Sequence, residues 1–306
     1  MREGHVKAGF IGTGNMGNHM AHNLLKNGVE LVVHDVRREA CQNLIELGAV
    51  WADSPREVGE QASVGFTSLP GPREIDEVTL AENGVYAGAA AGTVHVDLSS
   101  NSLSAVKRLA VLAAQRNIGF LDAPVSGGTS GAEAGTLAIM VGGDKASFDT
   151  VKPLFDMMGK NVYHLGDVGS GTVLKLTNNM LALGASLLLQ EVVTLGVKAG
   201  FDPQTLHSVW SNSSGRGQAA LMPNVLKRNW DNPFFSLALS AKDIGLCLEA
   251  ARDLDVPMPV ANAVGQWYTR SLVRGRGNKT WFATLATIEE DAGVQVPAWP
   301  DDAPQG

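Results

Sequence analysis

The sequence has very little cysteine. Only Cys41 and Cys247 occur among 306 residues, and they show neither a pairing pattern nor a metal-ligand spacing. This usage is typical of a reducing compartment, and because free cysteines are usually buried, we expect both thiols to be inert. The seven histidines are scattered without ligand spacing. The sequence therefore predicts no metal site.

Positive charge and long apolar runs are also scarce. The chain has 24 Lys and Arg against 31 Asp and Glu, a formal net charge of −7. This balance disfavours nucleic-acid binding and gives no sign of attraction to a membrane. No run approaches about 18 uninterrupted apolar residues, and the N-terminal stretch lacks the apolar segment of a signal peptide. We expect small diffusible partners and a cytoplasmic location, or an organelle matrix after loss of a transit peptide.

The pattern of short apolar runs divides the chain in two. At 44% hydrophobic residues and 306 residues, the chain is long enough for about two domains. Strand-like runs occupy 6–12, 31–35, 64–70, 93–99, 119–125, 137–143 and 161–165, with helix-like segments between them. This alternation predicts a Rossmann-type, doubly wound, mainly parallel sheet covered by helices on both faces.

After about residue 169 the strand-like runs stop. Helix-like segments follow at about 172–198, 203–210, 236–255 and 259–273. The first of them would be roughly 40 Å long at 1.5 Å per residue, enough to lead away from the sheet domain and line a cleft. We predict an α/β domain over 1–167 that binds the cofactor and an all-α domain over 168–306 that contributes to the substrate cleft and to oligomer contacts.

A glycine-rich stretch near the N-terminus has the form G-x-G-x-x-G. It comprises Gly12, Thr13, Gly14, Asn15, Met16 and Gly17, between a strand-like run and a helix-like segment. The first glycine of this fingerprint allows a tight turn, the second lets a pyrophosphate approach the backbone, and the third lets helix and strand pack closely. Free N–H groups at the helix start suit phosphates. The stretch predicts dinucleotide binding, with a purely structural turn as the alternative.

Asp35 bears on the choice of dinucleotide. It ends the second strand-like run, 18 residues after Gly17, where a carboxylate can accept both ribose hydroxyls of the adenosine. The same carboxylate would repel a 2′-phosphate, which favours NAD over NADP. Arg37 and Arg38 follow closely and could pair with a 2′-phosphate, or they could be solvated residues of the next helix. We predict NAD, with NADP as the alternative.

A second glycine-rich loop follows the fifth strand-like run. Ser126, Gly127 and Gly128 lie where the chain leaves the sheet. Successive glycines let backbone N–H groups converge on an anion, and the serine hydroxyl adds a donor. The loop predicts a site for a substrate carboxylate, and the alternative is a turn whose glycines only permit positive φ.

Lys175 lies early in the long helix-like segment, among apolar residues. Asn179 is four residues later and shares its helix face, whereas Asn178 is rotated away. A dehydrogenase acting on a hydroxyl group must move a proton as well as a hydride. Because partial burial disfavours the ammonium, we expect a lowered lysine pKa that suits proton transfer. Taken alone, Lys175 is better interpreted as a surface lysine with its stem along apolar neighbours.

The order of four blocks over nearly the whole chain resembles that of the β-hydroxyacid dehydrogenase family, which includes 3-hydroxyisobutyrate dehydrogenase and tartronate semialdehyde reductase. The blocks are GFIGTGNMG, DAPVSGG, GSGTVLKLTNN and FSLALSAKD. The resemblance implies an NAD-dependent oxidoreductase that moves a hydride between nicotinamide and a small 3-hydroxy acid or its semialdehyde. Lys175 would be its general acid/base and Asn179 its companion.

The resemblance also implies the remaining site residues. Ser126, Gly127, Gly128 and Asn178 would bind substrate, Lys242 would reach both cofactor and substrate, and Leu69, Pro70 and Ser100 would border the nicotinamide. The chain departs from the family pattern at Gly71, Glu74 and Asn101. In the loop 211–218, Ser213, Ser214 and Arg216 could contact a polar part of the substrate or be solvated turn residues.

The sequence leaves two other functions open. The imine reductase branch shares the architecture but reduces C=N, and it usually has another residue in place of Lys175. A cofactor-binding scaffold without turnover is the second alternative, and the pair Lys175 and Asn179 disfavours it. We also expect a homodimer or homotetramer, because the helical half has many apolar residues for a thin layer of helices.

Overall fold

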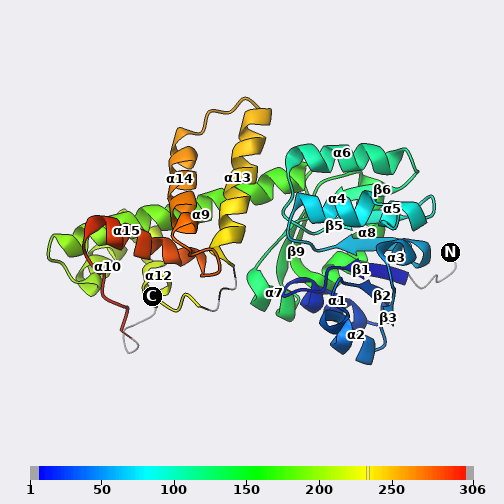
Figure 1. The fold of residues 1–306 in the computed structure, drawn as a ribbon, viewed down its shortest axis with the longest axis horizontal. Helices are drawn as coiled ribbons and strands as arrows, with labels where there is room; N and C mark the ends of the chain where they lie inside the picture. The colour runs from blue at the N-terminus through cyan, green and yellow to red at the C-terminus, as the bar shows by residue number, and fades with distance from the viewer. Residues whose placement is uncertain (1–6, 232, 234, 301–306) are drawn as a thin grey trace. The chain divides into compact units, whose positions relative to one another are not determined.

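The computed structural model describes residues 7–231, 233 and 235–300 (Figure 1). The start of the first predicted strand, residue 6, lies outside them. Contacts divide the chain into a first unit, Met1–Leu176, and a second unit, Thr177–Gly306. The predicted domain boundary at 167/168 lies just before a long helix, and the contact-based division lies within that helix.

The first unit is built on a six-stranded parallel sheet. Its strands are β1 (Lys7–Ile11), β2 (Glu30–His34), β3 (Val50–Trp51), β4 (Val64–Thr67), β5 (Val94–Asp97) and β6 (Gly119–Asp122). The order β3-β2-β1-β4-β5-β6 is that of the doubly wound dinucleotide-binding fold. The predicted fold class is therefore confirmed. Strand β3 was missed because it has only two residues.

Helices cover both faces of this sheet. They are α1 (Gly17–Lys26), η1 (Arg38–Cys41), α2 (Gln42–Glu46), α3 (Pro55–Gln61), α4 (Pro72–Leu80), α5 (Val85–Gly88), α6 (Leu103–Ala114), α7 (Gly128–Ala134) and α8 (Lys145–Met158). Neighbouring strand residues point to opposite faces, so Phe10 packs in a core with α1 and α8, and Ile11 packs in a core with α3 to α6. Both cores are apolar, which explains the nearly continuous apolar runs of the central strands.

The last three strand-like runs do not all extend the main sheet. The chain leaves β6 at Asp122 and forms a second sheet from β7 (Val125–Ser126), β8 (Leu137–Val141) and β9 (Gly159–His164). Strand β7 is antiparallel to β8, and β8 is parallel to β9. A backbone bridge between Asp122 and Gly142 joins the two sheets. The expectation of a single sheet is corrected here. The apolar run of β8 resembles a strand of the main sheet, and its sequence does not show which strands it pairs with.

Helix α9 (Ser170–Lys198) is the longest element of the described chain. Its length and composition would allow it to cross a membrane, a criterion that core helices also meet. Its second half is a core helix of the second unit, where the buried Gln190 donates to Ser186 Oγ and accepts from Thr284 Oγ1. These buried polar contacts belong to a packed protein interior rather than to a lipid-facing surface.

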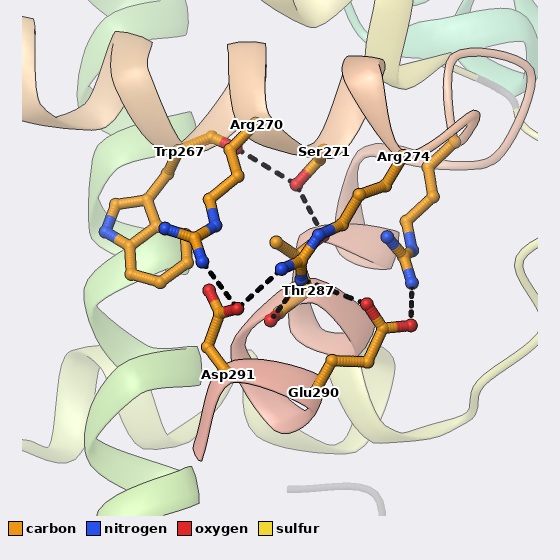
Figure 2. Close-up of polar contacts among 8 residues, drawn as sticks. Trp267, Arg270, Ser271, Arg274, Thr287, Glu290 and Asp291 are labelled. Atoms are coloured by element: carbon orange, nitrogen blue, oxygen red, sulfur yellow. Dashed lines mark hydrogen bonds and ion pairs between the residues drawn. The ribbon is translucent and has the colours of Figure 1, made fainter. Parts of the chain in front are cut away.

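Every regular element described after α9 is helical. The elements are α10 (Pro203–Ser211), α11 (Arg216–Ala219), α12 (Met222–Leu226), α13 (Leu237–Asp253), α14 (Pro259–Val273), η2 (Trp281–Ala283) and α15 (Thr284–Ala292). Figure 2 shows how polar contacts join α14 to α15: Arg274 pairs with both Glu290 and Asp291, and Arg270 pairs with Asp291. The pairs are largely exposed, so each adds little stability, and together they fix how α14 packs on α15.

Candidate functional site

The glycine-rich turn joins β1 to α1, and its three glycines meet different constraints. Gly12 has φ +88°, a conformation that L side chains rarely adopt. A Cβ on Gly14 would meet nothing within 4 Å, which leaves its backbone open to a ligand. A Cβ on Gly17 would lie 1.9 Å from the carbonyl oxygen of Gly12, so only glycine lets the helix start this close to the strand. This geometry fits a bound pyrophosphate.

A cleft of about 460 Å³ opens beside this turn. It is lined by Thr13, Gly14, Asn15, Asn18, His19, Arg37, Glu39 and Ala40. The lining includes the start of α1, whose first N–H groups have no partner within the helix. It also includes polar side chains from α1 and from the segment after β2. Asn18, His19 and Glu39 were not among the predicted residues. Their positions relative to the fingerprint, one turn into α1 and just past Asp35, could have indicated them.

Asp35 follows the end of β2, and its carboxylate is held by backbone groups. One oxygen accepts a hydrogen bond from the Thr13 N–H at 2.8 Å, and the other accepts from the Arg37 N–H at 3.0 Å. A carboxylate has about four acceptor positions, so it can still accept from a ribose hydroxyl. Asp35 therefore links the glycine turn to the segment on the other side of the cleft.

The two arginines after Asp35 have different surroundings. Arg37 lines the cleft. The guanidinium carbon of Arg38 lies 5.1 Å from the centroid of the Trp51 ring, a cation–π contact. Glu39 also lines the cleft, beside Arg37. The lining thus contains one arginine and one glutamate, and the carboxylate of Asp35 is hydrogen-bonded to the lining residue Thr13, an arrangement that favours NAD over a 2′-phosphate.

Cys41 lies behind the glycine turn. Its Sγ is 3.1 Å from Thr13 Oγ1, and the residue is fully buried. Cys247, in α13 of the second unit, is also buried. Burial raises the pKa of both thiols, so both stay protonated and unreactive near neutral pH.

The loops after β4 and β5 contain the residues expected to border the nicotinamide. The Leu69 N–H donates to Ser99 Oγ at 2.9 Å, which ties one loop to the other. The Ser99 N–H donates to Asp97 Oδ1, and Asn101 Nδ2 donates to Asp97 Oδ2. Asp97, at the end of β5, therefore organises the loop that carries Ser100.

A chain of buried polar groups continues below Asp97. Thr67 Oγ1 donates to Asp97 Oδ1 and also lies 3.1 Å from His95 Nε2, while the Tyr86 hydroxyl lies 3.0 Å from His95 Nδ1. Burial lowers the pKa of His95 to about 3, so the imidazole is neutral at physiological pH. Burial also raises the pKa of Asp97, against the opposing effect of its hydrogen bonds. These groups form a fixed support rather than a proton relay.

The departures from the family pattern have local explanations. Asn101 is only 1% exposed. Its Nδ2 donates to Asp97 Oδ2 and its Oδ1 accepts from the Ser102 N–H, so this buried side chain stabilises the loop. Gly71 lies at the N-cap of α4, and Glu74 is in the first turn of that helix, where an acidic residue suits the helix dipole. None of the three therefore needs to alter the loop that carries Ser100.

The second glycine-rich loop connects β7 to α7. Ser126 lies in β7 and pairs with Ala138 of β8. Gly127 and Gly128 have φ +136° and +64°, so both positions require glycine-like conformations. Gly127 is the N-cap of α7 and, as a glycine, supplies no side-chain cap to the first N–H groups of that helix. The role of this loop at a substrate carboxylate stays a prediction.

Asp122, the last residue of β6, holds the start of α9. Its Oδ1 accepts from the Gly169 N–H at 2.8 Å, and its Oδ2 accepts from the Thr172 N–H at 2.7 Å. Burial raises the pKa of Asp122 to about 6, and the two N–H donors oppose that rise. Sequence reasoning missed this residue, although it is the first letter of the DAPVSGG block.

Lys175 lies on α9, one turn after Thr172. It is 9% exposed, which excludes a fully solvated surface lysine. Asn178 is exposed, and its Nδ2 lies 3.3 Å from the Asn179 Oδ1.

In the second unit, Asp243 of α13 joins two predicted site residues. Asn179 Nδ2 donates to Asp243 Oδ2 at 2.6 Å, and Lys242 Nζ lies 3.1 Å from Asp243 Oδ1. Asp243 is 2% exposed, so this is a buried carboxylate that orients an amide and an ammonium. The role of Lys242 at cofactor and substrate stays a prediction. Ser213, Ser214 and Arg216 are exposed, and Ser213 Oγ donates to the Val209 carbonyl.

Two family models together match most of the chain. The model described as the NAD binding domain of 6-phosphogluconate dehydrogenase matches residues 7–166, and the model described as NAD-binding of NADP-dependent 3-hydroxyisobutyrate dehydrogenase matches residues 169–287. The chain belongs to the β-hydroxyacid dehydrogenase family. Its members are oxidoreductases that use NAD or NADP and act on CH–OH groups, which confirms the predicted class and cofactor.

Individual relatives agree with this family. A 2-(hydroxymethyl)glutarate dehydrogenase of Eubacterium barkeri is 39% identical over 294 residues, covering 95% of this chain and 97% of that protein. An NAD-dependent L-serine dehydrogenase of Pseudomonas aeruginosa is 36% identical, with 93% and 98% covered. The solved 3-hydroxyisobutyrate dehydrogenase of Mycobacterium tuberculosis with L-serine has a TM-score of 0.83 and 28% identity, with 92% and 99% covered.

The imine reductase alternative has less support. The structure of an imine reductase from Myxococcus stipitatus has a TM-score of 0.65 at 20% identity, which shows a common fold alone. The β-hydroxyacid dehydrogenases match this chain at much higher identity.

The raised pKa of Asp122 predicts how stability depends on pH. Because the folded-state pKa is about 6 and the ordinary value is 3.8, folding favours the protonated form. This contribution is complete below about pH 3.8 and is lost as pH rises through about 6. Relative to Asp122→Asn, which does not titrate, the unsubstituted protein should gain roughly 1.4 kcal/mol of unfolding free energy as pH falls from about 7.5 to about 5. Urea unfolding of both proteins across this range measures the difference, and a constant difference would contradict the prediction.

Proposed function

We propose that this chain is an NAD-dependent dehydrogenase for small 2-substituted 3-hydroxypropanoates, which it interconverts with their semialdehydes, and that Lys175 is its general acid/base. The observation that carries the proposal is the burial of Lys175 on a helix fixed to the strand end that leads into the Ser126–Gly128 loop. Buried ionisable groups cluster at functional sites, so the burial of Lys175 beside this strand end supports a catalytic role.

The substrate class comes from what the relatives' substrates share. The substrates in the names 2-(hydroxymethyl)glutarate dehydrogenase, 3-hydroxyisobutyrate dehydrogenase and L-serine dehydrogenase all have a carboxylate and a primary hydroxyl separated by one substituted carbon. The loop at Ser126, Gly127 and Gly128 would bind the carboxylate through backbone N–H groups and the serine hydroxyl. The variable substituent would then be the part that distinguishes one substrate from another.

The first unit supplies the cofactor site. NAD, when bound, accepts the hydride from the carbon that bears the hydroxyl. The glycine turn would hold the pyrophosphate at the start of α1, and Asp35 would accept hydrogen bonds from the adenosine ribose. The loops at Leu69 and Ser100, held together through Ser99 and Asp97, would position the nicotinamide. A rigid support of this kind reduces the entropy cost of reaching the reactive geometry.

Lys175 would complete the reaction by moving a proton. In the oxidation direction its neutral amine accepts the hydroxyl proton as the hydride leaves, and in the reduction direction the ammonium returns it to the aldehyde oxygen. Asn179 would act as an acceptor. Its Nδ2 donates to the carboxylate of Asp243, and its Oδ1, which already accepts from Asn178 Nδ2, has a second lone pair that can accept from the substrate hydroxyl or from the lysine.

We further propose a homodimer or homotetramer in the cytoplasm. Leu181, Leu188 and Leu195 are spaced by seven residues along α9 and are 75%, 59% and 70% exposed. Residues seven apart share one face of a helix, so they form an apolar stripe. A second copy of the chain is the partner that closed symmetry favours for such a stripe.

The first test removes the proton-transfer group. Lys175→Met should lower turnover by about 10²–10⁴, the usual scale for a general acid/base, while NADH still binds. Lys152→Met is the matched control, since Lys152 is an exposed lysine paired with Asp156 on α8. Steady-state rates with 3-hydroxyisobutyrate, L-serine and 2-(hydroxymethyl)glutarate, followed at about 340 nm, measure the effect. Near-normal activity of the Lys175 variant, or an oxidation rate that does not rise between about pH 7 and 10, would refute the role of Lys175.

The second test concerns the choice of cofactor. Asp35→Asn should raise the KM for NAD about tenfold or more, because two charge-assisted hydrogen bonds to the ribose are weakened. The substitution also weakens the bonds from Thr13 and Arg37, so the informative quantity is the ratio of kcat/KM for NADP to that for NAD. This ratio should increase, since the repulsion of a 2′-phosphate is removed while Arg37 remains. A preference for NADP in the unsubstituted protein would show that the cofactor prediction is wrong.

The third test concerns assembly. Sedimentation at micromolar concentration should give a dimer or tetramer, and Leu188→Lys should shift it toward smaller species. Val111→Lys is the matched control, because Val111 on α6 is also 59% exposed but lies outside the stripe. A monomeric unsubstituted protein would exclude the oligomer, and an equal effect of both substitutions would exclude the stripe as its interface.

A further inference from the structure

We propose that Asp122 is a positioning residue that holds Lys175 in register with the loop that binds the substrate carboxylate. The inference rests on the proposed role of Lys175 as general acid/base. In this role Asp122 acts through the backbone of α9 and touches neither cofactor nor substrate.

The first support is the geometry of the cap. Other helices of this chain begin with their own capping side chain: Asp144 accepts from the Ser147 N–H at the start of α8, and Asp202 does so from Thr205 at the start of α10. The cap of α9 comes instead from a residue 47 to 50 positions earlier in the chain, and it uses both carboxylate oxygens. A cap from a distant strand fixes the helix start to the sheet and does more than complete its hydrogen bonds.

The second support is the absence of space around this contact. A Cβ on Gly171, in the first turn of α9, would lie 2.1 Å from the Met140 carbonyl oxygen. A Cβ on Gly142 would lie 2.5 Å from Asp122 Oδ1. Both positions therefore require glycine, Gly171 because it lies against the Met140 backbone and Gly142 because it lies against the Asp122 carboxylate. The start of α9 packs against the end of β8 and against Asp122. A shift of the helix along its axis would break these contacts.

The third support is what lies on either side of Asp122. Its own backbone bridges to Gly142, and Ser126 follows only four residues later, after Pro124 has restricted the chain. On the helix side, Lys175 comes three residues after Thr172, about 4.5 Å along the axis at 1.5 Å per residue. The carboxylate is thus a short connection between the anion loop and the proton-transfer residue. This contact joins the block DAPVSGG to the block GSGTVLKLTNN.

The experiment compares three matched variants. Asp122→Asn keeps the size of the side chain but replaces one acceptor by a donor that faces an N–H group, so one of the two bonds is lost. We expect kcat with 3-hydroxyisobutyrate, at saturating NAD, to fall about 10- to 100-fold, the scale of a small misplacement of a reacting group. The dissociation constant of NADH should stay within about threefold, and the ionisation of Lys175 in the pH profile of kcat should shift. Asp144→Asn makes the same chemical change at the cap of α8 and should leave all three unchanged.

Lys175→Met separates this inference from the proposed function. If Lys175→Met is inactive while Asp122→Asn has normal kcat and an unshifted pH profile per folded molecule, the positioning role is overturned and the catalytic role stands. If Lys175→Met retains activity, the proposed role of Lys175 as general acid/base is refuted, and the positioning role of Asp122 that rests on it is refuted with it. A merely structural role would lower the folded fraction of Asp122→Asn without changing the pH profile.

A measurement on the unsubstituted protein covers the case in which Asp122→Asn does not fold. Amide hydrogen exchange should find the N–H groups of Gly169 and Thr172 protected, as expected for bonds to a buried carboxylate. Exchange of both amides at unprotected rates would show that the cap does not form, and this result would overturn the proposal without any variant.

Discussion

The parallel direction of the main sheet is the constraint on which the site depends. Because β1, β4, β5 and β6 all run the same way, their carboxyl ends meet at one edge, and each strand ends in a segment with a chemical feature. Gly12 follows β1, Leu69 follows β4, Asp97 ends β5 and Asp122 ends β6. Residues that lie more than a hundred positions apart are gathered by this one topological fact. An antiparallel arrangement would have sent half of them to the opposite edge.

Much of this could be read from the sequence, for identifiable reasons. Buried parallel strands have nearly continuous apolar runs, so β1, β2, β4 and β5 were found close to their observed bounds. Gly12, Gly14 and Gly17 were recognisable because close backbone approach admits only glycine, and such constraints leave a fixed spacing. Helices α10, α13 and α14 were found because proline, glycine and capping residues flank them. Constraints between residues that are close in the sequence produce patterns that can be recognised in the sequence.

Two residues that sequence reasoning missed make contacts with residues far away in the sequence. Asp122 accepts from N–H groups of residues 169 and 172, and Asp243 accepts from Asn179, 64 positions earlier. A lone aspartate in an apolar segment has no periodicity that identifies its partner. The second sheet was missed for a similar reason, because β8 is as apolar as the strands of the main sheet and its sequence does not identify the strands it pairs with. Strand β3 and helix α11 are simply too short to produce a pattern.

The two buried cysteines give this protein a built-in pair of probes. Cys41 lies in the first unit behind the cofactor turn, and Cys247 lies in the second unit within α13. Each thiol is shielded by the packing of its own unit, so a thiol reagent can react only when that unit opens. The rates of labelling at the two positions therefore report the local opening of the two halves separately, without any introduced dye or tag.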